Sequence, residues 1–258
     1  MHGDYEPIIF NTPNCFSEIE VYVISDLHMG SAQFDEVMWQ RAKEEIMSQP
    51  NRYCVFIGDM MENAVPGSKS DVFTQVATPL MQREWVAQQF TDLADRIIAV
   101  TDGNHERNRS YKLAGLYPNY DAAIIAGIED RYRPHFAICD IGVGTRDKDH
   151  SQQVRYVLYL VHKGKDGKGA NTALATSGVD VVCMGHTHAP LSMPRAQLTY
   201  NPINKVVSVK TVELVNGGSW CKYDDYAVDN GYLPNSQQKI KLVLHGGTKQ
   251  LETVGFYM

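Results

Sequence analysis

Two histidines stand two positions apart in the segment MGHTHAP, directly after the apolar run VDVVCM. Imidazole nitrogens bind divalent transition metals, and residues two apart on an extended segment point to the same side. We therefore expect His186 and His188 to reach into one cluster. Other polar residues that follow apolar runs can complete this cluster: Asp26, His28, Asp59, Asn104, His105 and His162.

Oxygen and imidazole ligands without thiolates suit manganese, iron, zinc or nickel. Seven candidate ligands, with His105 set aside, are too many for one tetrahedral ion but enough for two ions that share a carboxylate. Two-metal sites with ions about 3.5 to 4 Å apart hydrolyse phosphate esters. Gly58, Gly103 and Gly185 adjoin the candidate ligands, where glycine permits close approaches that a side chain obstructs.

The polar residues follow apolar runs that have the length and β-branched composition of strands: IEVYVIS, RYCVFIG, DRIIAVT, VRYVLYLV and VDVVCM. Helix-like patterning separates the first three runs, over Asp35–Met47 and over Val72–Asp95, where Pro79 is a break or a first-turn residue. Alternating strands and helices predict α/β units with a parallel core sheet. Ligands bind beyond the carboxyl ends of such strands, so we expect one convergent site there.

After Pro190 the sequence becomes β-rich, and we predict a second, mostly antiparallel sheet from LSMPRAQLTY, KVVSVKTVELV, KIKLVLH and LETVGFYM. The segment KGKDGKG, from Lys163 to Gly169, indicates a flexible loop. No linker or repeat divides the chain. We expect one domain over residues 1–258, with the metal motifs in 26–188 and the β-rich part in 190–258.

The composition is that of a soluble globular protein, with 258 residues, 43% hydrophobic residues and a formal net charge of −6. This charge gives no global attraction to nucleic acid or to an anionic membrane. The five cysteines include no C-x-x-C pair, which indicates a reducing compartment, with Cys54 and Cys183 in the core. There is neither a secretion signal nor a membrane-spanning run, so we expect a cytoplasmic location in a bacterium or a phage-infected cell.

The motifs D-x-H, G-D-x-x-E, G-N-H-E, a strand-end histidine and G-H-T-H, in this order from Asp26 to His188, resemble those of the calcineurin-like metallophosphoesterase superfamily. The resemblance implies an α/β fold, a sandwich of two mixed β-sheets flanked by helices. It implies one metal site formed by Asp26, His28 and His188, and a second formed by Asn104, His162 and His186. Asp59 would bridge the two ions.

The resemblance also assigns roles in hydrolysis, with a metal-activated hydroxide as the nucleophile and His105 as the general acid. Where the family often has G-D-x-x-D, this chain has Glu62, which we expect to orient His105 through a hydrogen bond. Asn63 stands where the phosphoserine/threonine phosphatase branch has arginine. This difference disfavours that branch.

We expect two divalent ions, with manganese as the first choice and iron, zinc, nickel or cobalt as alternatives. Arg107, Arg109 and Lys163 are candidate substrate contacts, although a solvated surface explains such basic residues equally well. Neighbouring tyrosines favour nucleic-acid or nucleotide phosphodiesters as substrates. The alternatives are a small-molecule phosphomonoesterase and, in a different class, a non-catalytic, metal-stabilised binding protein. We expect neither a membrane nor a protein partner.

Overall fold

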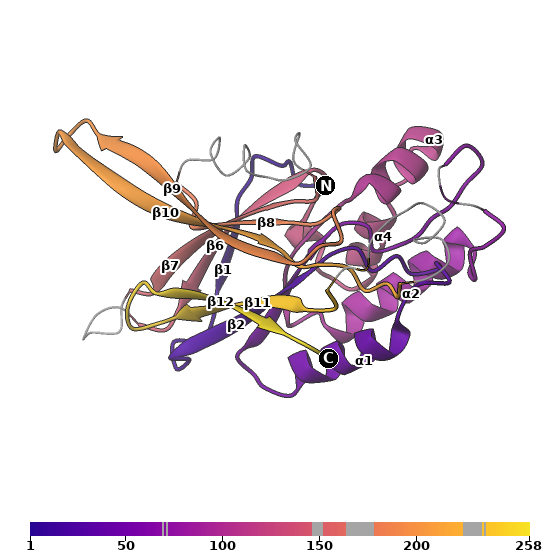
Figure 1. Ribbon diagram of the computed structural model, residues 1–258, viewed down its shortest axis with the longest axis horizontal. Helices are drawn as coiled ribbons and strands as arrows, with labels where there is room; N and C mark the ends of the chain where they lie inside the picture. The colour runs from indigo at the N-terminus through magenta and orange to yellow at the C-terminus, as the bar shows by residue number, and fades with distance from the viewer. Residues whose placement is uncertain (69, 71, 146–151, 164–177, 224–233, 235) are drawn as a thin grey trace.

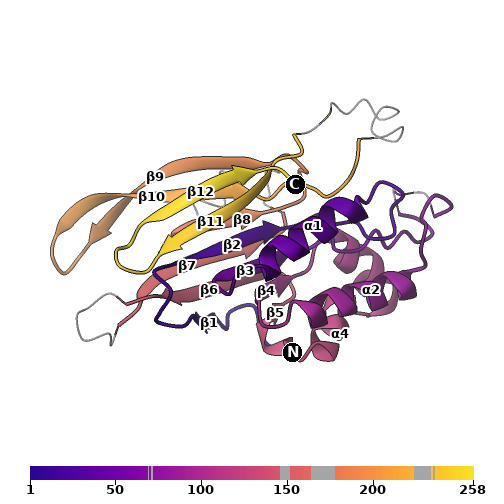
Figure 2. The ribbon, with the colours of Figure 1, turned by 90° about the horizontal axis from the view of Figure 1, so that it is seen from below.

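The computed structural model describes residues 1–68, 70, 72–145, 152–163, 178–223, 234 and 236–258. Two six-stranded mixed β-sheets, here called sheet A and sheet B, lie against each other, and helices cover the other side of sheet B (Figure 1, Figure 2). In spatial order, sheet A contains β1 (Ile8–Asn11), β6 (Phe136–Val143), β7 (Val154–Val161), β8 (Val181–Met184), β10 (Val206–Asn216) and β9 (Leu191–Asn201). Sheet B contains β12 (Leu251–Phe256), β11 (Lys239–His245), β2 (Glu18–Ile24), β3 (Arg52–Ile57), β4 (Ile97–Thr101) and β5 (Tyr132–Arg133). The expected fold class is confirmed.

The helical elements follow the strands of sheet B: α1 (Glu36–Met47), α2 (Pro79–Asp92), η1 (Glu106–Tyr111), α3 (Lys112–Ala114), α4 (Pro118–Ile125) and η2 (Glu129–Arg131). Asp35 caps α1 by accepting a hydrogen bond from the Met38 nitrogen at 3.0 Å. The expected helix over Val72–Asp95 is shorter than predicted. Pro79 begins α2, because proline lacks the N–H that a first-turn residue does not need.

Parallel pairing joins β2 to β3 and β3 to β4, as the alternating pattern predicts, with α1 and α2 as the crossover helices. One hydrophobic core lies between the two sheets, and a second lies between sheet B and the helices. Cys54 and Cys183 are buried, free thiols in these cores, as expected. Within the described residues, no helix is long and apolar enough to cross a membrane.

The β-rich part after Pro190 does not form a second sheet of its own, so this prediction was wrong. The hairpin of β9 and β10 joins sheet A, because β10 pairs in parallel with β8. The hairpin of β11 and β12 joins sheet B, because β11 pairs antiparallel with β2. Both hairpins are antiparallel as expected, but each extends a sheet begun earlier in the chain. Residues 164–169 of the predicted loop lie outside the described residues.

Candidate metal centre

The predicted ligands follow the carboxyl ends of five strands, which belong to both sheets. Asp26 and Asp59 stand two residues after β2 and β3, and Asn104 stands three residues after β4. His162 directly follows β7, and His186 stands two residues after β8. The sandwich thus brings together side chains from distant parts of the sequence.

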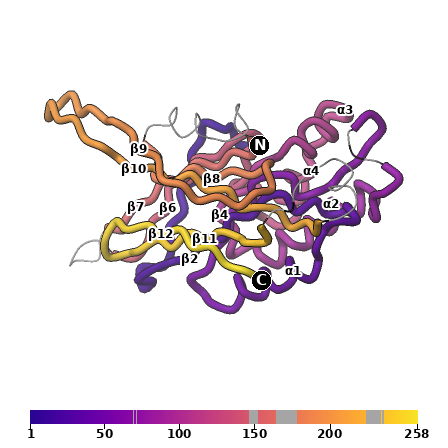
Figure 3. Tube along the Cα trace, viewed as in Figure 1, coloured from indigo at the N-terminus to yellow at the C-terminus, as the bar shows by residue number. Residues whose placement is uncertain are grey.

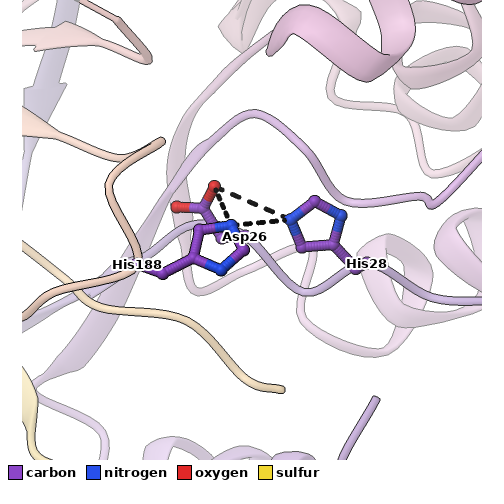
Figure 4. A group of neighbouring side chains, drawn as sticks. All are labelled: Asp26, His28 and His188. Atoms are coloured by element: carbon purple, nitrogen blue, oxygen red, sulfur yellow. Dashed lines mark hydrogen bonds and ion pairs between the residues drawn. The ribbon is translucent and has the colours of Figure 1, made fainter. Parts of the chain in front are cut away.

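Asp26, His28 and His188 form one group, whose ligand atoms all lie within 4.8 Å of one another (Figure 4). Asp26 Oδ1 lies 3.5 Å from His188 Nε2 and 3.8 Å from His28 Nε2. The two Nε2 atoms lie 3.1 Å apart. His28 Nδ1 lies 3.1 Å from Glu62 Oε2, and an Nδ1–H donated there leaves the Nε2 lone pair directed into the group.

Asp59, His162 and His186 form a second group of the same kind. Asp59 Oδ2 lies 3.1 Å from His162 Nε2, and the opposite ring nitrogen, Nδ1, donates to the Ile57 carbonyl at 2.7 Å. The side-chain oxygen of Asn104 lies 3.2 Å from the same Nε2. A backbone carbonyl therefore fixes the orientation of this imidazole toward the group.

The two groups adjoin each other. His162 Nε2 lies 3.9 Å from Asp26 Oδ1, an atom of the first group. Asp59 also belongs to a third group with His28 and His105, and Asp59 Oδ2 lies 3.7 Å from His105 Nε2. The carboxylate of Asp59 therefore lies between the imidazoles of His28 and His105 on one side and those of His162 and His186 on the other. A ligand that bridges two ions requires this position.

Most of the predicted ligands have backbone dihedral angles in the left-handed region of the Ramachandran plot. The predicted ligands with positive φ are Asp26 (53°), His28 (52°), Asp59 (52°), His186 (72°) and His188 (58°). Among the described non-glycine residues, only Asn63 and Lys205 share this property. Each such conformation costs roughly 1–3 kcal/mol and is typical of functional sites. The prediction of an extended G-H-T-H segment was therefore wrong, and the two left-handed residues direct their rings into different groups.

Glycines permit the close approach of the loops after β3 and β4. A Cβ at Gly103 would lie 2.1 Å from Asp59 Oδ1, and a Cβ at Gly58 would lie 2.2 Å from the Gly103 nitrogen. A Cβ at Gly185 would lie 2.8 Å from Asp26 Oδ2. The close approaches expected at these three glycines are confirmed.

Glu106, which stands in the G-N-H-E motif without a predicted role, holds the same two loops together from within the core. Its side chain is fully buried, and its carboxylate accepts four backbone hydrogen bonds. The donors, at 2.8 to 3.2 Å, are the nitrogens of Asp59, Met60, Met61 and Gly103. Burial, together with the neighbouring Asp59 charge, raises the pKa of this carboxyl group, while the Gly103 and Met61 nitrogens stabilise its anion.

The electrostatics of the buried acids favour a bound cation. Burial opposes ionisation of Asp26, but His188 and His162 outweigh it and lower the pKa of Asp26 to about 2. Burial also opposes ionisation of Asp59, and His162 and His105 nevertheless hold its pKa well below the usual value. Against burial, the two acids raise the pKa of His162 to about 10. A proton on His162 thus stands where a divalent cation can replace it.

The donor set fits divalent transition metals. Its members are carboxylate, amide and imidazole groups, which suit hard and borderline cations. Two of the imidazoles, those of His28 and His162, have their outer nitrogen bound to a protein acceptor and their Nε2 directed into the cluster. Since His28 Nε2 and His188 Nε2 approach each other closely, a cation between these two atoms would satisfy both lone pairs.

A protein-family model for calcineurin-like phosphoesterases matches residues 19–190, about two thirds of the chain. The chain belongs to the calcineurin-like phosphoesterase family. No curated protein matches it in sequence.

Solved structures resemble this calcineurin-like phosphoesterase at low identity. YfkN from Bacillus subtilis, itself a calcineurin-like phosphoesterase, has 13% identity and a TM-score of 0.48 over 94% of this chain and 91% of its own. A predicted phosphoesterase from Streptococcus pneumoniae has 10% identity and a TM-score of 0.41 over 94% and 100%. Vps29 from Entamoeba histolytica, complexed with zinc, has 14% identity and a TM-score of 0.38 over 92% and 99%. These likenesses concern the fold alone.

In this calcineurin-like phosphoesterase, the carboxylate of Glu62 orients a different histidine from the one expected. Glu62 Oε2 lies 3.1 Å from His28 Nδ1 but 3.8 Å from His105 Nδ1. His105 Nδ1 instead donates to the backbone carbonyl of Glu62 at 2.8 Å. The expected side-chain bond to His105 was therefore wrong. Burial raises the pKa of Glu62, but the hydrogen bond and charge of His28 outweigh it and lower that pKa to about 2.

Arg109 lies inside the centre rather than on its rim. Its Nη1 lies 3.0 Å from Glu62 Oε1, and its Nη2 lies 3.0 Å from His105 Nε2. The π-helix η1, an element often found at functional sites, carries Arg109 four residues after His105. Burial, with the Arg109 charge contributing, lowers the pKa of His105 to about 4. The predicted substrate contact at Arg109 is thus a partner of the predicted general acid.

Arg107 and Lys163, the other predicted substrate contacts, line a pocket of about 380 Å³. Asn104 and His162, two predicted ligands of the second ion, form part of its wall. Lys112 and His135 also line it. His135 stands in no recognised motif, so the sequence predicts no role for it, and only the fold brings it beside the centre.

Proposed function

We propose that this chain is a dinuclear, metal-dependent hydrolase of phosphate esters. The observation that carries the proposal is the contiguity of two groups of acid and imidazole ligands around Asp59, with His105 facing its carboxylate. Asp26, His28 and His188 would hold one ion. Asn104, His162 and His186 would hold the other, and Asp59 would be shared. When bound, two divalent ions such as manganese lower the pKa of a water molecule and neutralise charge on the phosphoryl group.

His105 would donate a proton from Nε2 to the departing ester oxygen. Its Nδ1 donates to the Glu62 carbonyl, so Nε2 is the ring atom that exchanges a proton with the substrate. Burial lowers the pKa of His105 to about 4, and an anionic phosphate beside the ring raises it again. The imidazole would therefore acquire its proton together with the substrate. Arg109, which adjoins Nε2 at 3.0 Å, would stabilise charge on the phosphoryl oxygens.

We also propose that phosphodiesters of nucleic acids or nucleotides are the preferred substrates, with small phosphomonoesters as the second candidate. The pocket beside Asn104 carries the cationic side chains of Arg107, Lys112 and Lys163, which suit an adjacent phosphate. Tyr111, which is exposed, directly precedes Lys112, and its ring centroid lies 4.6 Å from that of the partly buried Tyr117. An exposed aromatic ring can stack with a base.

The hydrolase proposal is tested with chromogenic phosphate monoesters and diesters in the presence of manganese. The wild-type chain should hydrolyse at least one of them. His105→Ala should lower kcat by about 100-fold or more, the usual contribution of a general acid, while metal content stays unchanged. A wild-type chain that binds two ions without turnover would contradict the proposal and favour the non-catalytic binding role.

Labelled single- and double-stranded DNA and RNA, together with mononucleotides, separate the two substrate classes. The double variant Arg107→Ala/Lys112→Ala should raise KM for polymers more than for a chromogenic ester. Lys205→Ala, at an exposed position on the β9–β10 turn, is the matched control. Resistance of every polymer, with efficient cleavage of small monoesters, would reject the preference for nucleic acid.

A further inference from the structure

The hairpin of β9 and β10 extends past the rest of sheet A, at the end of the sandwich opposite the helices (Figure 1, Figure 3). β10 pairs with β8 only over Glu213–Asn216. Among the described strands, Val206–Val212 of β10 therefore pair with β9 alone. A two-stranded ribbon is at best marginally stable in water without a surface to cover one of its faces.

Side chains of this ribbon alternate between two unlike faces. The first, here called the apolar face, carries the cross-strand pairs Leu198–Val209 and Tyr200–Val207. These four side chains are 61 to 79% exposed. The opposite face carries mostly polar side chains, Gln197, Thr199, Ser208 and Lys210, with Val206 beside the turn.

The apolar face continues the core-facing side of sheet A. Along β10, Val215 lies on the same side as Val207 and Val209, since successive side chains alternate, and Val215 belongs to the core between the sheets. Thr211 and the partly buried Glu213 lie on this side between the exposed valines and Val215. Figure 2 shows the β9–β10 hairpin reaching beyond the β11–β12 hairpin of sheet B. The ribbon thus exposes apolar side chains at a position that sheet B no longer covers.

We propose that the apolar face packs against the same face of a second copy of this chain. The four side chains expose on the order of 500 Å², so two copies would bury up to about 1,000 Å², which is the minimum for a specific interface and indicates a weak dimer. In a two-fold dimer the same surface of each copy meets its counterpart. None of the four side chains is charged, so their contact creates no repulsion between like charges. Sheet faces of this kind pack together as a β-sandwich.

An anionic lipid surface fits the same face less well. The chain carries a formal net charge of −6, which opposes approach to such a surface. Lys205 is the single cation in the turn Pro202–Lys205 between the strands. A second copy, by contrast, supplies an apolar sheet face of matching width.

Light scattering after size-exclusion chromatography tests the proposal on the full chain. The wild type, with a chain mass of 29.0 kDa, should elute with the mass of two chains and dissociate on dilution. Leu198→Lys/Val209→Lys places charges in the interface and should raise the dimer dissociation constant by at least about 100-fold. Thr199→Lys puts the same charge on the opposite face of the hairpin and should leave the dimer intact.

A milder variant guards against misfolding of the lysine variant. Val207→Thr/Val209→Thr keeps β-branched side chains that exposed strands accommodate, and it should still weaken the dimer. A wild type that is monomeric at every concentration would overturn the proposal, as would a dimer that both double variants leave unchanged. Binding of a monomeric wild type to phosphatidylcholine and phosphatidylglycerol vesicles would assign the face to lipid instead, and would also overturn it.

Discussion

Glu106→Gln tests how the metal centre is held in place. Glutamine keeps the size of the side chain but replaces one carboxylate oxygen by an NH₂ group, which cannot accept a hydrogen bond from a backbone N–H. Each oxygen of Glu106 accepts two of its four bonds, so two bonds are lost whichever oxygen is replaced. The new amide would also face N–H donors without an acceptor.

The size of the effect follows from these bonds. A hydrogen bond to a charged group contributes about 1.5–3 kcal/mol, so the free energy of unfolding should fall by about 3–6 kcal/mol. At about 2–4 °C per kcal/mol for a chain of this size, the Tm should fall by roughly 6–24 °C. Because Oε2 anchors the Asp59 nitrogen at 3.0 Å, metal affinity should also fall, by about 10- to 100-fold.

Thermal unfolding followed by circular dichroism measures the stability, and calorimetric titration with manganese measures the affinity. Glu129→Gln is the matched control, because Glu129 is exposed and lies outside the metal motifs. If Glu106→Gln left the Tm within about 2 °C of the control and the affinity unchanged, the four bonds would not be what positions Asp59.

Three further perturbations test other parts of the structure. Burial lowers the pKa of Lys239 to about 8 from 10.5, so the folded state disfavours its charge. Lys239→Met removes the cation–π interaction with Trp220 but should still raise the free energy of unfolding by about 1–3 kcal/mol at pH 7. Urea unfolding should show this gain vanishing by about pH 10.5. Gly103→Ala should abolish manganese binding in dialysis, because its Cβ would meet Asp59, whereas Gly247→Ala, with nothing within 4 Å, should not. The pKa of Glu62 is about 2 in the folded chain and 4.5 ordinarily. The free energy of unfolding of the metal-free chain should therefore fall as the pH drops from about 4.5 to 2. Glu62→Gln should make this fall smaller in acid titrations.

The parallel core and the gathering of polar side chains at the strand ends were predictable from the sequence because both depend on local patterns. Each strand of the β2, β3 and β4 core has a β-branched run, and each run ends directly before a polar residue. Asp35 and Pro79 mark helix starts through the chemistry of their own side chains and backbones. These features need no knowledge of contacts between distant segments.

The remaining features depend on such contacts. The carboxylate of Glu62 has two histidines within 4 Å, and the fold rather than the motif places His28 nearer than His105. The four donors to Glu106 come from two separate loops. Likewise, the sequence of β9 to β12 shows hairpins but not which free sheet edge each one joins, because pairing with β8 or β2 is a long-range choice.

The central claim is that Asp59 joins two neighbouring cation sites, and the count of bound metal ions tests it most directly. Equilibrium dialysis against manganese, followed by mass spectrometric metal analysis, should give two ions per wild-type chain. Asp59→Asn should weaken the retention of both ions, while the control Glu129→Gln keeps both. A folded wild type that retains no ion, or an Asp59→Asn variant that binds two ions with unchanged affinity, would contradict the account.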